Sequence, residues 1–431
     1  MNVTRHTDAN FSAQLDRAVR TSSLFDPAIE EQARAIVEQV RAKGDAALVE
    51  LTEKFDGAKL SPSQLAVTTA DFMAASLEVP EALRAAVTDA HSSIEAFSRK
   101  SLRQDWQARN QHGAAVGEKF DPFQRVGIYI PGGTAPLVSS VLMTVTLAKV
   151  AGCPEIVVCT PCRKDGSVHP AILFAARTAG ATEVYKVGGA QAVAAMALGT
   201  KSIAPVQKVF GPGNAYVVAA KRLLFGHVAV DLLPGPSEVL VLADDSANPK
   251  FVAADLLAQA EHGSGHERVW LVTTSGKLLK AVEKEVTRQL GKLARKAFIE
   301  KALKANGWLI HVEEMDHAVA LVNRIAPEHC EVMTAHARDV AKKITMAGAI
   351  FLGDYSPTVL GDYVAGPSHE LPTGGAGRSF AGLTTDQFQR RTSIVEYGKG
   401  ALKHAMASVQ VFAKVEGLDA HGRSASIREN K

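Results

Sequence analysis

A glutamine and a histidine able to bind a metal stand near the middle of the chain, in the run Gln259-Ala260-Glu261-His262. Because Gln259 and His262 are three residues apart, their side chains share one face of a helix. An imidazole nitrogen and an amide oxygen are both reasonable zinc ligands. The same run is also typical of a polar helix end that Gly263 terminates, so this segment alone leaves both interpretations open.

Two further segments carry side chains that can bind a metal. Asp362 lies in the glycine-punctuated run Gly361-Asp362-Tyr363, where an aspartate serves either as a carboxylate ligand or as an ordinary turn residue. Glu416 and His421 lie close together near the C-terminus, in the run Glu416-Gly417-Leu418-Asp419-Ala420-His421. A solvated chain end is the alternative interpretation of this last run.

Proton transfer is indicated by the run Pro327-Glu328-His329. Pro327 can begin a helix, which would place Glu328 and His329 in its first turn. Adjacent helical residues point in different directions, so that each could serve a separate proton transfer. A lone Glu-His pair is also common on protein surfaces.

Two glycine loops could bind the phosphates of a dinucleotide. The runs Gly211-Pro212-Gly213-Asn214 and Pro131-Gly132-Gly133 each follow an expected strand. Such loops present backbone N–H groups and a helix N-terminus to an anion. Neither matches G-x-G-x-x-G, and a plain tight turn is the alternative. Two such loops at the strand ends of one parallel sheet favour a cofactor, because ligands bind at that edge.

The expected secondary structure that positions these residues is helical at first and then alternates between strands and helices. Residues up to about 110 read as helices; Ala33, Ile36, Val37 and Val40, for example, share one helical face. Strand-like and helical segments alternate from Val126 onward, which predicts mostly parallel sheets with helices on both faces. The expected strands are 126–130, 155–159, 182–186 and 208–210 in a first unit, and 238–243, 268–273 and 309–312 in a second.

Composition excludes several classes of protein. The net charge of +3 and the scattered Lys and Arg residues argue against a nucleic-acid-binding protein. No apolar signal segment and no membrane span appear, which predicts a cytoplasmic location. Cys159-Thr160-Pro161-Cys162 is a C-x-x-C run that could be a redox pair or half a zinc site. Since no second metal-binding pair accompanies it, reduced cysteines at the end of a buried strand are expected.

Taken together, these segments resemble histidinol dehydrogenase over nearly the whole chain. Besides the runs above, Tyr129-Ile130, Gly188-Gly189-Ala190-Gln191-Ala192, Phe210 and Gly235-Pro236-Ser237-Glu238 carry the resemblance, and all occur in the family's order. The resemblance implies a homodimer that oxidises L-histidinol to L-histidine through an aldehyde, with one zinc ion per subunit and two NAD⁺ per substrate molecule. It also implies that the C-terminal tail crosses to the partner subunit.

The resemblance assigns roles to individual residues. The implied zinc ligands are Gln259, His262, Asp362 and His421, and the implied acid–base pair is Glu328 and His329. The zinc ligands and His329 would also contact substrate, together with Ser237 and Glu416, and the implied NAD contacts are Tyr129, Gln191 and Asn214. His369 and Cys153 lie near the motifs and are given no role.

The expected fold is α/β, with two incomplete Rossmann-like domains, a helical N-terminal segment and a small C-terminal tail domain. Residues 1–120 are expected to pack with 238–378 as one domain, residues 121–237 to form the NAD-side domain, and residues 379–431 to reach the partner subunit. Three other functions remain open: a zinc and NAD dehydrogenase for another small polar alcohol, such as a sulfonated diol; a zinc hydrolase without NAD; and a metal-binding scaffold.

Overall fold

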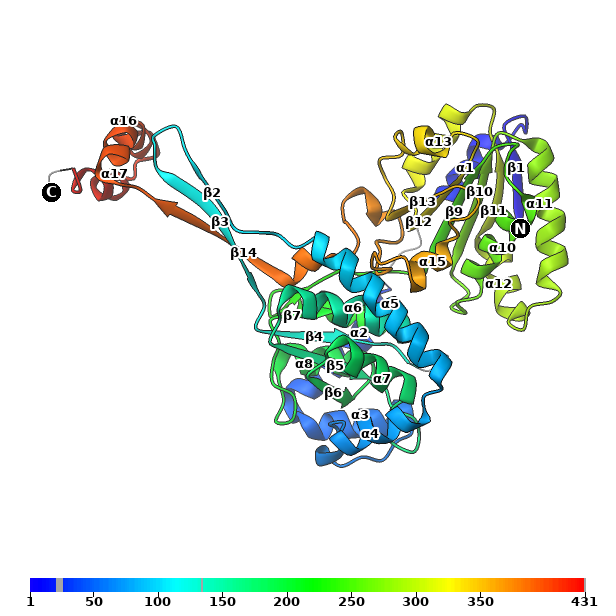
Figure 1. Cartoon of the computed structure of the whole chain (residues 1–431), viewed down its shortest axis with the longest axis horizontal. Helices are drawn as coiled ribbons and strands as arrows, with labels where there is room; N and C mark the ends of the chain where they lie inside the picture. The colour runs from blue at the N-terminus through cyan, green and yellow to red at the C-terminus, as the bar shows by residue number, and fades with distance from the viewer. Residues whose placement is uncertain (21–25, 133–134, 430–431) are drawn as a thin grey trace.

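The computed structural model describes residues 1–20, 26–132 and 135–429. Two α/β units lie side by side, and a long β-arm that carries the C-terminal helices projects away from both (Figure 1). This arrangement confirms the predicted α/β class with parallel sheets and a separate tail.

The first unit is built on a five-stranded parallel sheet in the order β6-β5-β4-β7-β8. Its strands are short and largely buried, as β-branched runs such as Ile156-Val157-Val158 predict. One face packs against α6 (Val138–Ala151) and α7 (Pro170–Ala179), and the other against α8 (Gly189–Leu198) and α9 (Ala215–Leu224). The strands are β4 (Arg125–Tyr129), β5 (Glu155–Thr160), β6 (Glu183–Lys186), β7 (Lys208–Phe210) and β8 (Ala229–Val230).

The second unit repeats this topology. Its sheet runs β1-β11-β10-β9-β12-β13, so that five of its strands follow the same third-second-first-fourth-fifth order as the first sheet. Helices α10 (Pro249–Ala260), α11 (Gly276–Leu290) and α12 (Lys296–Asn306) cover one face, and α1 (Phe11–Val19) and α13 (Met315–Ile325) the other. The strands are β1 (Asn2–Arg5), β9 (Glu238–Ala243), β10 (Arg268–Thr273), β11 (Gly307–His311), β12 (His329–Met333) and β13 (Ala349–Leu352).

The N-terminal segment is divided between the two units, which differs from the prediction. Among the described residues before 120, those of β1 and α1 join the cores of the second unit. Val37 and Val40 instead join the core beneath α8 and α9, and Val87 and Ile94 join the core beneath α6 and α7. The prediction that 1–120 packs with 238–378 is therefore wrong for the four helices in between, which are α2 (Pro27–Lys43), α3 (Asp45–Asp56), α4 (Thr69–Glu78) and α5 (Glu81–Lys100).

The arm is a three-stranded antiparallel sheet formed by β2 (Trp106–Arg109), β3 (Ala115–Pro122) and β14 (Gln389–Glu396). Helices α16 (Lys399–Glu416) and α17 (Asp419–Ser426) pack on each other at its far end (Figure 1). Because β3 belongs to the arm, the NAD-side unit begins at β4 rather than at 121. No helix within the described ranges is long and apolar enough to cross a membrane.

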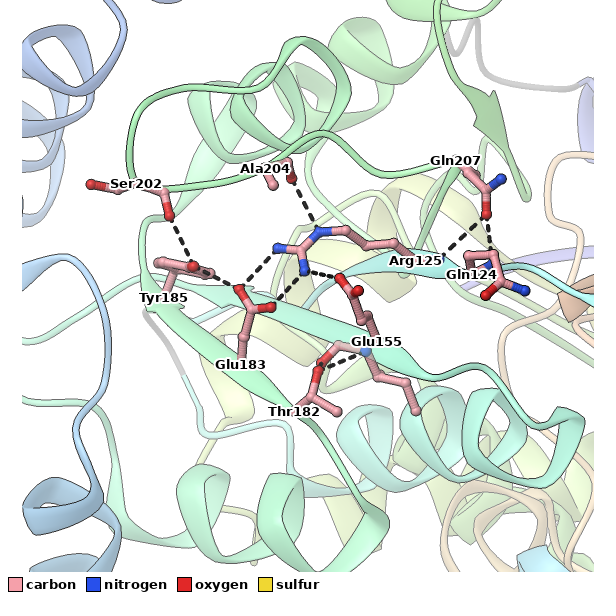
Figure 2. Close-up of polar contacts among 10 residues, drawn as sticks. Gln124, Arg125, Glu155, Thr182, Glu183, Tyr185, Ser202, Ala204 and Gln207 are labelled. Carbon is pink, nitrogen blue, oxygen red and sulfur yellow. Dashed lines mark hydrogen bonds and ion pairs between the residues drawn. The ribbon is translucent and has the colours of Figure 1, made fainter.

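An arginine joins the starts of three neighbouring strands of the first sheet (Figure 2). Arg125, the first residue of β4, binds Glu183 with both terminal nitrogens and also contacts Glu155. The Tyr185 hydroxyl donates to Glu183 at 2.7 Å and so extends the network along β6. This cluster lies at the amino edge of the sheet, away from the edge at which ligands bind to such folds.

Candidate active site

Six of the predicted site residues line one cavity of about 420 Å³ where the two α/β units meet: Ser237, Gln259, His262, Glu328, His329 and Asp362. The first unit contributes the loops Pro131-Gly132 and Pro212-Gly213, which follow the carboxyl ends of β4 and β7. The second unit contributes residues at the amino ends of β9 and β12 and at the end of α10. Segments far apart in the sequence therefore converge here.

The three candidate metal ligands of this cavity come from two elements and a loop. Gln259 lies in the last turn of α10, and His262 follows that helix. Asp362 lies on the short helix α15 (Thr358–Tyr363), where the sequence had indicated only a glycine-punctuated loop. The Gln259 amide nitrogen is buried and reaches no hydrogen-bond partner among the described residues. An amide nitrogen donates hydrogen bonds and cannot bind a cation, so the side-chain oxygen is the atom of Gln259 that could bind a metal.

These ligands do not complete a metal centre by themselves. Within residues 1–20, 26–132 and 135–429, no group of three His, Cys, Asp or Glu side chains is placed to hold a metal ion. His262 and Asp362 are two such side chains, and Gln259 adds an amide oxygen. This nitrogen and oxygen donor set suits zinc, and because zinc usually has four ligands in proteins, a zinc centre here would need at least one more.

Glu328 and His329 are both held by the backbone of Glu238. The Glu238 N–H donates to Glu328 Oε2 at 2.7 Å, and its carbonyl oxygen lies 2.9 Å from His329 Nδ1. The predicted helix start at Pro327 is wrong, because His329 begins β12, which pairs with β9 on one side and β13 on the other. The Glu238 carbonyl can only accept, so Nδ1 carries the proton and Nε2 keeps its lone pair.

Burial shifts the pKa values of Glu328 and His329 in opposite directions. It lowers the pKa of His329, whose side chain is almost wholly enclosed, and so favours the neutral imidazole. It raises the pKa of Glu328 well above its usual range, in spite of the N–H bond from Glu238. His329 is therefore a base at neutral pH, and Glu328, when ionised, is a stronger base than an ordinary carboxylate.

A second His-Glu pair also lines the cavity and was not predicted. His369 Nδ1 lies 3.0 Å from the Asp362 carbonyl oxygen, and Nε2 lies 3.2 Å from the Ser140 hydroxyl. Glu370 Oε1 lies 3.4 Å from Nε2 and raises the pKa of His369 against the opposing effect of burial. The adjacency of His369 and Glu370 repeats that of Glu328 and His329, and this was the signal available in the sequence.

The candidate NAD contacts lie at the carboxyl edge of the first sheet, outside the cavity wall. Tyr129 ends β4, and its hydroxyl accepts from the Gly189 N–H at 3.2 Å. Gln191, two residues further along α8, is buried, and its Oε1 has no donor in the described part of the chain. Asn214 caps α9 with its side-chain oxygen, which accepts from Tyr216 and Val217.

The glycine loop before α9 is held by a buried ion pair. Lys221 is fully enclosed and donates both to the Gly211 carbonyl and to Asp231, whose other oxygen accepts from the Gly211 N–H at 2.8 Å. Gly211 has a φ of +104°, and a Cβ there would clash with the Tyr129 carbonyl. Gly133, predicted in the other glycine loop, lies outside the described residues.

A second cavity of about 570 Å³ continues along this edge and shares Pro131, Gly132 and Ala135 with the first. It extends past the end of β5 to Cys162, Arg163 and Lys164. The two cavities together form an extended trough across the strand ends, the place where dinucleotides bind to such sheets. Cys159 is buried and Cys162 half-buried, and both are free, in agreement with the prediction for the C-x-x-C run.

Glu416 and His421 are not brought to this cavity within one chain. Glu416 ends α16 and His421 lies on α17, both exposed at the far end of the arm (Figure 1). Large apolar side chains are exposed on α16, with Phe412 66% and Val415 80% accessible. Such surface usually marks a contact with another protein surface.

Comparison with known proteins gives consistent matches. A family model described as histidinol dehydrogenase matches residues 19–429. Histidinol dehydrogenase from Heliobacterium mobile is 44% identical over 97% of this chain and 98% of its own length, and that from Bacteroides fragilis (strain YCH46) is 47% identical over 95% and 94%. The crystal structure of histidinol dehydrogenase from Elizabethkingia anophelis superposes with a TM-score of 0.95 at 35% identity, covering 99% of this chain and 98% of that one.

Proposed function

This chain belongs to the histidinol dehydrogenase family, and on that premise we propose that it oxidises L-histidinol to L-histidine through L-histidinal, reducing two NAD⁺. The observation that carries the proposal is the cavity in which Gln259, His262 and Asp362 lie with the buried pair Glu328 and His329. Together they place candidate metal ligands and two proton acceptors around one cavity. Oxidation of an alcohol, and then of a hydrated aldehyde, needs such proton acceptors beside the substrate.

We further propose a zinc ion held by Gln259, His262, Asp362 and the partner subunit's His421. When bound, the ion would hold and orient the substrate through its imidazole and amine, both good zinc ligands. Ser237 lines the same cavity and would contact the substrate, as would the partner subunit's Glu416. The absence of thiolates from this donor set favours a role in binding over a role in polarising the alcohol.

The chain's own residues would move the protons. His329 Nε2 accepts the hydroxyl proton when a hydride leaves the carbinol carbon of histidinol, and the Glu238 carbonyl fixes the required tautomer. Glu328 then takes a proton from the water that adds to the aldehyde. Once His329 has returned its first proton to solvent, it accepts the hydrate's hydroxyl proton in the second oxidation. NAD⁺, when bound, would supply the hydride acceptor for both oxidations.

NAD⁺ would lie across the carboxyl edge of the first sheet, with Tyr129, Gln191 and Asn214 as contacts. The unpartnered Gln191 oxygen and the trough past Pro131-Gly132 support this placement. Gly211 lets the loop before α9 pass close to the Tyr129 carbonyl at this edge, and the Asn214 oxygen already binds the Tyr216 and Val217 N–H groups of α9.

Counting the NADH formed from a limiting amount of histidinol tests the proposal. We expect two NADH per histidinol, and loss of activity after a chelator that added zinc restores. One NADH per histidinol would mean that the aldehyde is released. No NADH with histidinol, but turnover of a sulfonated diol, would show a different alcohol substrate. The absence of NADH with every alcohol would contradict the dehydrogenase proposal and favour a hydrolase.

A further inference from the structure

Helices α10 and α15 each present two residues, one turn apart, to the same narrow gap. Asp255 and Gln259 on α10, and Thr358 and Asp362 on α15, line a cavity of about 10 Å³. Gln259 and Asp362 are the proposed zinc ligands, so Asp255 and Thr358 each lie one turn before a ligand. A cavity of this size holds at most about one water molecule, so these four residues enclose only a narrow gap between the two helices.

Glu331 on β12 is hydrogen-bonded to a residue of each helix. Its Oε1 accepts from the Thr358 backbone N–H at 2.7 Å and from the Thr358 hydroxyl at 2.6 Å. A side-chain hydrogen bond joins it to Asp255. Glu331 Oε2 is buried, and no N–H or hydroxyl group of the described chain reaches it. Because two carboxyl groups can bond only through a proton, a protonated Asp255 supplies the missing donor.

The surroundings of the pair favour this shared proton. Burial and the neighbouring Glu331 raise the pKa of Asp255 to about 8, and burial also raises the pKa of Glu331. Ionising both the buried Glu331 and the half-buried Asp255 would bring two negative charges together, so at neutral pH the pair carries one negative charge. The Thr358 donors lie at Glu331, which places this charge on Glu331.

We propose that Asp255, Glu331 and Thr358 form a positioning unit that ties α10 to α15 and thereby fixes the separation of the ligands Gln259 and Asp362. Glu331 also follows His329 by two residues on β12, so both side chains lie on the same face of the strand. The unit therefore fixes the positions of the two metal ligands relative to the proposed base, His329. This inference rests on the zinc site proposed above.

The test compares zinc affinity and thermal stability in full-length variants. Zinc is stripped with a chelator, and the zinc dissociation constant is measured by competition with a chromophoric chelator. Asp255→Ala should weaken zinc binding by about 10–100-fold, the usual effect of removing an outer-shell partner. Asp255→Asn should bind zinc nearly as the wild type does, because its amide N–H can donate to Glu331 in place of the shared proton.

The matched control is Leu256→Ala, which destabilises the neighbouring buried position of α10 without touching the unit. It should lower the melting temperature of the metal-free protein and leave the zinc dissociation constant close to that of the wild type. If Asp255→Ala does not fold, Thr358→Val serves instead, since it removes the hydroxyl donor and retains the N–H; it should weaken zinc binding by a smaller factor.

Three results would overturn the unit: unchanged zinc affinity in the variant that removes the bond, equal weakening in Leu256→Ala at the same loss of stability, or failure of Asp255→Asn to restore affinity. None of these three results contradicts the proposed zinc site, provided that the wild type binds one zinc ion per subunit. A wild type that binds no zinc contradicts the proposed function and the unit together.

Discussion

A single backbone unit, the N–H and C=O of Glu238, positions both groups proposed to move protons. The Glu238 carboxylate itself points elsewhere and pairs with Arg268. A main-chain clamp of this kind cannot be recognised from residue types, because every residue has an N–H and a C=O. The sequence could therefore single out Glu328 and His329, but their orientation depends on the register between β9 and β12.

The two proton acceptors can be separated by kinetics. His329→Asn should lower the rate of histidinol oxidation about 10²- to 10⁴-fold, because the hydroxyl proton loses its acceptor. Glu328→Gln should slow the oxidation of added histidinal more than that of histidinol, because only the aldehyde step needs water. Steady-state rates with each substrate measure both effects.

The control for these variants is His266→Asn, an exposed histidine outside the cavity, which should leave both rates unchanged. Full turnover of histidinol by His329→Asn would show that another group is the base. Equal slowing of both substrates by Glu328→Gln would remove its assignment to the water step.

Among the elements, the β-rich strands of the two sheets were predicted, whereas the edge strands β1, β8 and β13 and the strand β12 were missed. Runs such as Val126–Ile130 and Glu238–Ala243 are β-rich and bounded by turn residues, and both form buried strands. The N-terminal helices were also predicted, but the α/β unit against which most of them pack was not. An amphipathic stripe shows which face of a helix is buried, and it does not show which sheet covers that face. The arm strand Gln389–Glu396 was missed, since it is polar and largely exposed on both faces.

The strand starts of the first sheet depend on the ion pair between Arg125 and Glu183. Arg125 lowers the pKa of Glu183, in spite of partial burial. A carboxylate with a depressed pKa stabilises the folded state above its unfolded pKa, and this contribution is lost as the pH falls through the folded value. At pH 7, Glu183→Gln should lower the free energy of unfolding by about 1 kcal/mol, allowing for solvent screening of a partly exposed pair.

Denaturant unfolding of the wild type and of Glu183→Gln at pH values from 7 to about 3 measures this effect. The difference between the two proteins should be constant near neutrality and should shrink below the ordinary glutamate pKa of 4.5. Glu53→Gln, which alters an exposed pair with Lys59, is the control and should have almost no effect. A difference that does not depend on pH would show that charge on Glu183 is not what stabilises the strands.

At the scale of the whole molecule, the described chain separates the proposed site into two places. Ser237, Gln259, His262, Asp362 and the proton acceptors share one cavity, whereas Glu416 and His421 lie at the end of the arm. The sequence indicated each motif, but no local sequence pattern predicts that Glu416 and His421 lie on a projecting tail. Exposed apolar side chains on α16 favour burial of that tail against a second copy.

Complementation between inactive variants tests the shared site most directly. His262→Asn and His421→Asn chains are purified separately, shown to be inactive, and mixed under conditions in which subunit exchange is demonstrated with labelled chains. A mixed dimer has one site in which both histidines are intact, so NADH formation from histidinol should return with one working site per mixed dimer. Proven exchange without any recovered activity would contradict a site built from two subunits.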